Sequence, residues 1–134
     1  MSFVIKKGQP GVEALWNDLD AKLASGSLSK DEHALFKRLV EAASLLADNP
    51  RHPGLVSHEI ATLAKRCGRK VFESYLQNNA PAAGRIFWVY GPEDGMITVI
   101  GIEPHPEDAK SRGYDRVKLA DMPATTQPGS KKRK

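Results

Sequence analysis

Three residues in the second half of the sequence could together cleave a phosphodiester bond. Glu73, Arg85 and His105 each lie in, or at the end of, a run rich in β-branched and aromatic residues. RNA cleavage by its own 2′-hydroxyl needs a base to take that proton, a cation to hold the phosphorane charge, and an acid to protonate the leaving 5′-oxygen. A glutamate, an arginine and a histidine supply these groups. The alternative is a solvent-facing glutamate, a surface ion pair and a turn histidine, because positions within strands do not establish convergence.

Basic and aromatic side chains near these runs are candidates for RNA contact. Within the region expected to fold, lysine and arginine are densest at Arg51, Lys65, Arg66, Arg69 and Lys70. These residues are either phosphate anchors beside the run that holds Glu73 or ordinary solvated surface. Trp88 could stack on an unpaired base. Alternation places Phe87 on the opposite sheet face from Trp88, so one of the two faces is expected to be core.

Histidine and cysteine are poorly spaced for a metal site. His52 and His58 match no helical two-ligand motif, and the lone cysteine, Cys67, excludes an internal disulfide and any thiolate zinc site. Isolated surface or capped histidines are the favoured interpretation. We therefore expect neither a metal nor another cofactor.

Composition and charge narrow the class of protein. With 40% hydrophobic and 27% charged residues the chain is typical of a soluble globular protein. It has no apolar run near the roughly 20 residues that span a bilayer and no apolar signal region, so we expect a cytoplasmic protein without a membrane partner. Four of the twenty basic residues lie at 131–134, so residues 1–130 carry sixteen bases against sixteen acids. The net charge of +4 thus favours a polyanionic partner only weakly.

Hydrophobic periodicity predicts the first elements that must position these residues. A short strand at 3–5 ends at a Gly/Pro break, and apolar residues recur at helical spacing from Val12 to Leu23. Ser29 and Glu32 have the spacing of a capping box, which predicts that a second helix begins there and runs to about Asp48. The two helices form a helical hairpin.

The second half of the chain predicts a sheet. Three β-rich runs lie at 71–77, 85–90 and 96–102, and the last two flank a five-residue loop typical of a β-hairpin. Residues 60–65 form either a short third helix or an irregular loop. The predicted class is α+β, with the helical hairpin on one sheet face and the other face left open. Leucines of both helices are expected to pack against the two hairpin strands: Leu15, Leu19, Leu35, Leu39 and Leu46.

The domain organisation follows from a change in composition near the end of the chain. From Pro123 the sequence is rich in Thr, Pro, Gly and Ser and ends in four bases, a composition that cannot bury a core. We expect one domain at 1–122 and a disordered basic tail at 123–134.

In this order, the segments resemble the RelE/ParE toxin superfamily. The resemblance covers about residues 2–106. It rests on the first strand and helical hairpin, the connector at 49–51, and the stretches 70–75, 84–90 and 97–105. It implies a compact α+β domain in which an N-terminal strand and a helical hairpin pack on a curved antiparallel sheet. The open face of that sheet would hold messenger RNA in the ribosomal A site.

Within the superfamily, the site pattern looks closest to the YoeB- and RelE-type mRNA interferases. The resemblance implies a general base at Glu73, a phosphate stabiliser at Arg85 and a general acid at His105. Those toxins end shortly after their histidine, often beside a tyrosine, whereas this chain has Pro106 there and continues for twenty-eight residues. Tyr114 is the candidate that would return to the site and contact RNA.

The resemblance implies a toxin of a type II toxin-antitoxin system. It would be a ribosome-dependent endoribonuclease that cleaves messenger RNA and inhibits translation, with the ribosome, the messenger RNA and a cognate antitoxin as partners. The alternative is a non-enzymatic ParE-like toxin that binds DNA gyrase, or a protein-interaction domain on the same fold, because fold does not fix function. The presence of Glu73, Arg85 and His105 together favours the nuclease.

Overall fold

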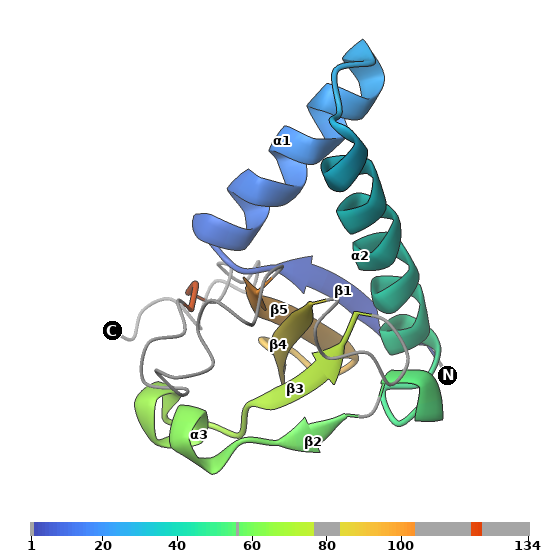
Figure 1. Cartoon of the computed structure of the whole chain (residues 1–134). Coiled ribbons are helices and arrows are strands. Elements are labelled where there is room, and N and C mark those ends of the chain that lie inside the picture. Colours follow the sequence, from blue (N-terminus) through green and yellow to red (C-terminus); the bar gives the residue numbers. More distant parts are fainter. Residues whose placement is uncertain (1, 56, 77–83, 104–118, 122–134) are drawn as a thin grey trace.

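Helices and a five-stranded sheet make up an α+β fold in this computed structural model, which describes residues 2–55, 57–76, 84–103 and 119–121. The strands are β1 (Val4–Lys7), β2 (His58–Glu59), β3 (Phe72–Tyr75), β4 (Arg85–Tyr90) and β5 (Met96–Glu103). The helices are α1 (Gly11–Ser25), α2 (Lys30–Asp48), α3 (Ala61–Cys67) and the single 3-10 turn η1 (Pro53–Leu55). Figure 1 shows α1 and α2 rising together on one side of the sheet, with α3 on the other side. No helix within the described residues has the length and apolarity needed to cross a membrane.

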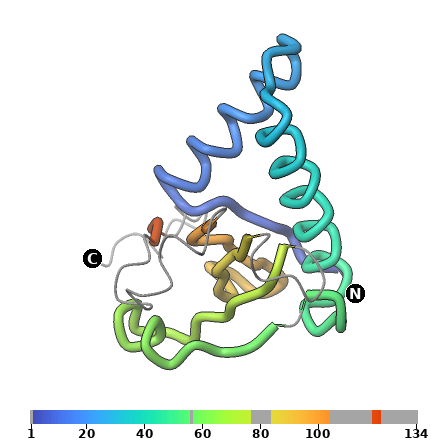
Figure 2. The backbone as a smooth tube through the Cα atoms, in the orientation of Figure 1, coloured from blue at the N-terminus to red at the C-terminus, as the bar shows by residue number. Residues whose placement is uncertain are grey.

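The sheet is mixed, which corrects the prediction of an antiparallel sheet. The strand order is β1-β5-β4-β3-β2, and β1 pairs with β5 in parallel while the other neighbours are antiparallel. A tight turn forces β4 and β5 to run in opposite directions, as the hairpin prediction required. The whole chain between β1 and β5, including the helical hairpin, separates those two strands, so no turn fixes their relative direction (Figure 2).

Local sequence determines where the hairpin helices begin and end. The capping box at the start of α2 is confirmed: the Ser29 hydroxyl accepts from the Glu32 backbone N–H at 3.1 Å, and the Glu32 carboxylate accepts from the Ser29 N–H at 3.0 Å. Helix α1 ends at Gly26, whose φ of 75° is in the left-handed region that favours glycine. These signals place the α1–α2 turn at residues 26–29.

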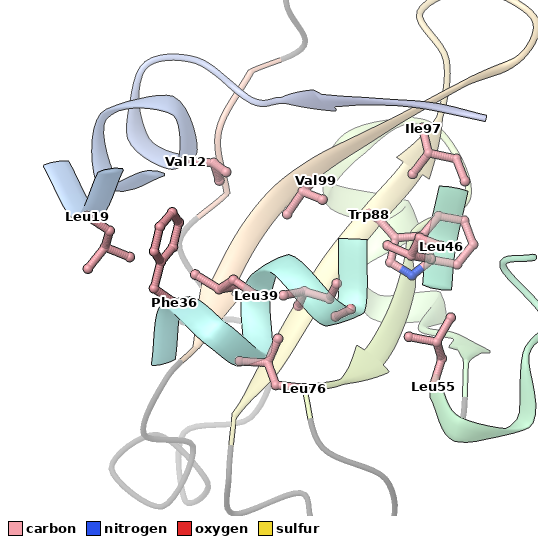
Figure 3. Close-up of a cluster of buried hydrophobic side chains, with 12 residues drawn as sticks. Val12, Leu19, Phe36, Leu39, Leu46, Leu55, Leu76, Trp88, Ile97 and Val99 are labelled. Atoms are coloured by element: carbon pink, nitrogen blue, oxygen red, sulfur yellow. The ribbon is translucent and has the colours of Figure 1, made fainter. Parts of the chain in front are cut away.

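The main hydrophobic core lies between the helical hairpin and the sheet. Leu19, Leu39 and Leu46 are buried there, and Leu15 and Leu35 pack against the same cluster while partly exposed. Figure 3 shows the three buried leucines gathered with Trp88, Ile97 and Val99 of the sheet. The predicted packing of the leucines is confirmed.

A second, smaller core covers part of the sheet face that the sequence predicted to be open. Residues 61–65 fall in the helix α3, and Leu63 of this helix and its N-cap residue Ile60 both face the sheet. They pack with Val71, Phe87, Val89 and Ile100. Both faces of β4 are therefore core along most of the strand. The part of this face near Arg85 carries charged groups instead.

Candidate functional site

Glu73 and Arg85 contact each other on the sheet face opposite the helical hairpin. In the antiparallel register Glu73 lies across from Phe87, and Arg85 is two residues from Phe87 along β4, so both side chains point to the same face. Diagonal neighbours of this kind are within reach of long side chains. The Glu73 Oε2 atom lies 2.6 Å from Nη1 of Arg85. The structure thus brings together two of the three residues of the predicted trio.

The Glu73 carboxylate is buried and bound through both of its oxygens. Its side chain is 2% exposed, and Oε1 lies 2.7 Å from Nε2 of His58 while Oε2 contacts Arg85. An ionised carboxylate is costly to bury without such partners. His58 reaches Glu73 because the two residues face each other in the β2–β3 register.

Arg85 also binds a second carboxylate, that of Glu103. These two residues are register partners in the β4–β5 hairpin, and the Arg85 Nη2 atom lies 2.5 Å from Oε1 of Glu103. The guanidinium also lies 5.6 Å from the centre of the Phe87 ring, within cation–π range. We call His58, Glu73, Arg85 and Glu103 the β-face cluster. It joins four neighbouring strands.

The formal charge of the β-face cluster is negative when the imidazole is neutral. Two carboxylates, Glu73 and Glu103, surround one guanidinium. A phosphate that approached Arg85 would therefore compete with two carboxylates that already contact the guanidinium. Any anionic substrate must displace or share at least one of them, and Glu103, 14% exposed, is the more accessible of the two.

The third predicted residue, His105, and the candidate Tyr114 lie outside the described residues, as does the predicted tail at 123–134. Two members of the β-face cluster were missing from the predicted site. His58 was considered only as a metal ligand or an isolated surface histidine, and Glu103 was not considered. The signal for Glu103 was its place directly after the predicted run at 96–102, whose end lies near the start of the β4 run in a hairpin.

The predicted RNA-binding bases are all exposed, and Arg69 lies at the far end of β4 from Arg85 of the β-face cluster. Lys65 and Arg66 are in the last turn of α3, and Arg69 and Lys70 follow Gly68, whose φ of 74° turns the chain. The Arg69 guanidinium donates to the Tyr90 carbonyl at 3.3 Å, at the opposite end of β4 from Arg85. At about 3.3 Å per residue the two ends are roughly 17 Å apart. Arg51 is exposed in the connector after α2.

Trp88 is a core residue, which corrects its prediction as an RNA-stacking residue. Only 1% of its surface is exposed, and the ring stacks on Phe72 at a centroid distance of 4.7 Å. Its indole N–H donates to the Ser74 hydroxyl at 2.8 Å. Strand alternation turns Trp88 toward the helical hairpin, where Leu46 and Leu55 surround it (Figure 3). A base therefore has no access to the ring.

Metal ligation finds no support in the described part of the chain. Among those residues, no three histidines, cysteines, aspartates or glutamates come close enough to hold a metal ion. The β-face cluster has a different character, since its guanidinium occupies the space between the two carboxylates. Its chemistry is that of proton transfer and anion binding.

Comparison with known proteins gives no family: no protein-family model, no curated protein and no solved structure matches the chain. Function must therefore be inferred from the residues and their geometry.

Proposed function

We propose that the chain is a RelE/ParE-type toxin that cleaves messenger RNA on the ribosome and thereby inhibits translation. The observation that carries this proposal is the contact between Glu73 and Arg85 at 2.6 Å on the sheet face opposite the helical hairpin. A carboxylate that drives proton transfer and a guanidinium that stabilises a phosphorane must act on one phosphodiester, so their side chains must lie near each other on one face. In cells the toxin would act in the cytoplasm and be held inactive by a cognate antitoxin.

The order of the elements also supports the proposal. An N-terminal strand and a helical hairpin precede the antiparallel strands β2 to β5, and the hairpin covers one face of the sheet. This order is compatible with the arrangement that the sequence resemblance implies, apart from the parallel pairing of β1 and the core that α3 adds on the face expected to be open. The exposed bases Arg69 and Lys70 follow α3, and Arg69 contacts the Tyr90 end of β4. Their positive charge could neutralise the RNA backbone beyond the scissile phosphate.

A cleavage map of translated messenger RNA tests the proposal. The full chain is induced in growing cells, and new 5′-ends are mapped on a translated message and on the same message with its start codon removed. We expect growth arrest and cuts only in the translated message. Arg85→Ala should slow cleavage by about 100-fold, the usual cost of losing one preorganised charge donor. Lys37→Ala, an exposed charge change on α2, is the control. Equal cleavage by wild type and Arg85→Ala would contradict the proposal.

The second candidate is a non-enzymatic toxin that binds DNA gyrase, or an interaction domain on the same scaffold. The observation that favours it is the enclosure of Arg85 between Glu73 and Glu103, which is also what a structural ion-pair network would look like. A gyrase supercoiling assay with the purified chain separates the two candidates. Inhibition that survives Arg85→Ala, together with intact messenger RNA in the cells, would favour the binder.

A further inference from the structure

The two ends of the contact between His58 and Glu73 differ sharply in their access to solvent. The Glu73 side chain is 2% exposed, whereas the His58 side chain is 42% exposed. The strand that carries His58, β2, is also the last in the sheet order, next to β3 alone. A substrate can therefore reach the imidazole without any rearrangement of the strands.

We propose that Glu73 acts through His58: the exposed imidazole takes the proton from the RNA 2′-hydroxyl, and the buried carboxylate is a positioning residue. This assignment rests on the proposed nuclease function and specifies its base. It differs from the role that the sequence resemblance implies, in which Glu73 is itself the general base.

Burial is the first reason to move the base from Glu73 to His58. A general base must come within about 2.6–3.2 Å of the proton it removes, directly or through one water. Both Glu73 oxygens are already in ion-pair contact, Oε1 with His58 and Oε2 with Arg85. A 2′-hydroxyl that reached Glu73 would have to break one of these contacts inside the fold.

The geometry of the contact is the second reason, because it determines which imidazole nitrogen can act as the base. Nε2 of His58 lies 2.7 Å from the Glu73 carboxylate, which only accepts, so Nε2 carries the proton. In the neutral ring the lone pair is then on Nδ1. A carboxylate that orients an imidazole in this way also stabilises the imidazolium that forms when the base takes a proton.

The reaction step balances as follows. The 2′-oxygen forms a bond to phosphorus and its proton moves to Nδ1 of His58. The bond from phosphorus to the 5′-oxygen breaks, and that oxygen takes a proton from water, whose hydroxide ion then takes the proton from His58 and so restores the base. The products are a 2′,3′-cyclic phosphate and a 5′-hydroxyl. Arg85, 2.6 Å from Glu73, holds the charge that develops on the phosphoryl oxygens.

The test compares single-turnover cleavage of ribosome-bound messenger RNA by the full chain and its variants. His58→Gln keeps a polar side chain of similar reach but cannot take the proton, so we expect kcat to fall by about 100-fold or more with KM nearly unchanged. The matched control is His33→Gln, an exposed histidine on α2 outside the β-face cluster, which should cleave like wild type. Added imidazole should restore much of the rate lost in His58→Ala.

A double-mutant cycle tests the positioning role of Glu73. If Glu73 acts only through His58, then Glu73→Gln slows the wild type but has little further effect on His58→Gln, because the two residues form one unit. If Glu73 is the base itself, Glu73→Gln removes the residual activity of His58→Gln.

The outcomes separate this inference from the proposed function. A wild type that cleaves nothing overturns both. An active wild type matched by His58→Gln overturns only the role of His58. A slow His58→Ala that imidazole does not restore assigns His58 a structural role and also overturns the inference.

Discussion

The two faces of the sheet are filled in different ways. Beneath the helical hairpin the contacts are almost entirely apolar, with Trp88, Ile97 and Val99 against the leucines of α1 and α2. The opposite face is apolar near α3, and another part of it is filled by the β-face cluster, with one residue from each of β2, β3, β4 and β5. Apolar burial is non-directional, whereas each member of an ion-pair cluster depends on its partners.

This difference indicates where stability and function are located. Replacing a buried ion pair with well-packed apolar residues is often neutral or stabilising, so such a pair is weak support for a stabilising role. The hairpin face contains the larger core, so we expect it to contribute the larger share of the free energy of unfolding. The comparison therefore favours the β-face cluster as the functional region. Mutations on either face can test this difference between the two faces.

The largest effect on stability is expected on the hairpin face, from Trp88→Ala. Truncation removes a fully buried ring that stacks on Phe72, and should cost about 3–5 kcal/mol in the free energy of unfolding. The matched control is Tyr90→Ala, whose ring is 42% exposed on the same strand and which should cost much less. Urea denaturation measures both. Equal losses at the two positions would show that the hairpin face is not the main source of stability.

The next effect is expected within the β-face cluster. Arg85→Met leaves Glu73 buried without its guanidinium, and should cost about 3 kcal/mol. The double variant Glu73→Leu with Arg85→Met removes both charges and should recover most of that loss. Both variants should cleave RNA at least about 100-fold more slowly than the wild type. If the double variant were less stable than the single one, the cluster would be a structural element and the comparison between the faces would fail.

The apolar half of this comparison could be predicted from the sequence, and the charged half only in part. Helical spacing placed Leu19, Leu39 and Leu46 correctly. Apolar residues that recur once per turn lie on one side of a helix, and that side must pack against the core. Alternation correctly separated Phe87 from Trp88. It did not show that both faces would be core, because α3 was too short for its periodicity to distinguish a helix from a loop.

Glu103 and His58 were missed for two separate physical reasons. Counting from Tyr90↔Ile97 in the hairpin, regular pairing would place Ile102 opposite Arg85, but an irregularity between Phe87 and Trp88 shifts the register by one residue and brings Glu103 there instead. His58 lies in a strand of two residues, which no periodicity can reveal. The contact between Glu73 and Arg85 depends on the β3–β4 register alone, and the two β runs that carry them were both recognised.

A smaller effect, on RNA affinity, is expected from Glu103→Gln. This variant tests how the negative charge of the β-face cluster affects RNA binding. Glu103 competes with a phosphate for Arg85, so neutralising it should tighten RNA binding by roughly fivefold at low salt, about the value of one partly exposed ion pair. Asp94→Asn makes the same change in net charge in the exposed β4–β5 turn and is the control. A fluorescence titration with a short single-stranded RNA measures both. Equal gains for the two variants would show that only net charge matters.

The smallest effect concerns Cys67, the last residue of α3. The reactivity of its thiol depends on the opposing effects of burial and of nearby basic charge on its pKa. Burial raises the pKa of the Cys67 thiol, while the neighbouring Arg66 and Arg69 act in the opposite direction with the smaller effect. A raised pKa leaves less thiolate at neutral pH, so iodoacetamide should modify Cys67 more slowly than a free cysteine at pH 7.5. The rate should climb as the pH rises through the pKa. Arg66→Gln should slow the reaction further, with Lys37→Gln on α2 as the control. Modification faster than that of free cysteine would mean that the bases outweigh burial, and would make the end of α3 a stronger anion-binding region than the β-face cluster.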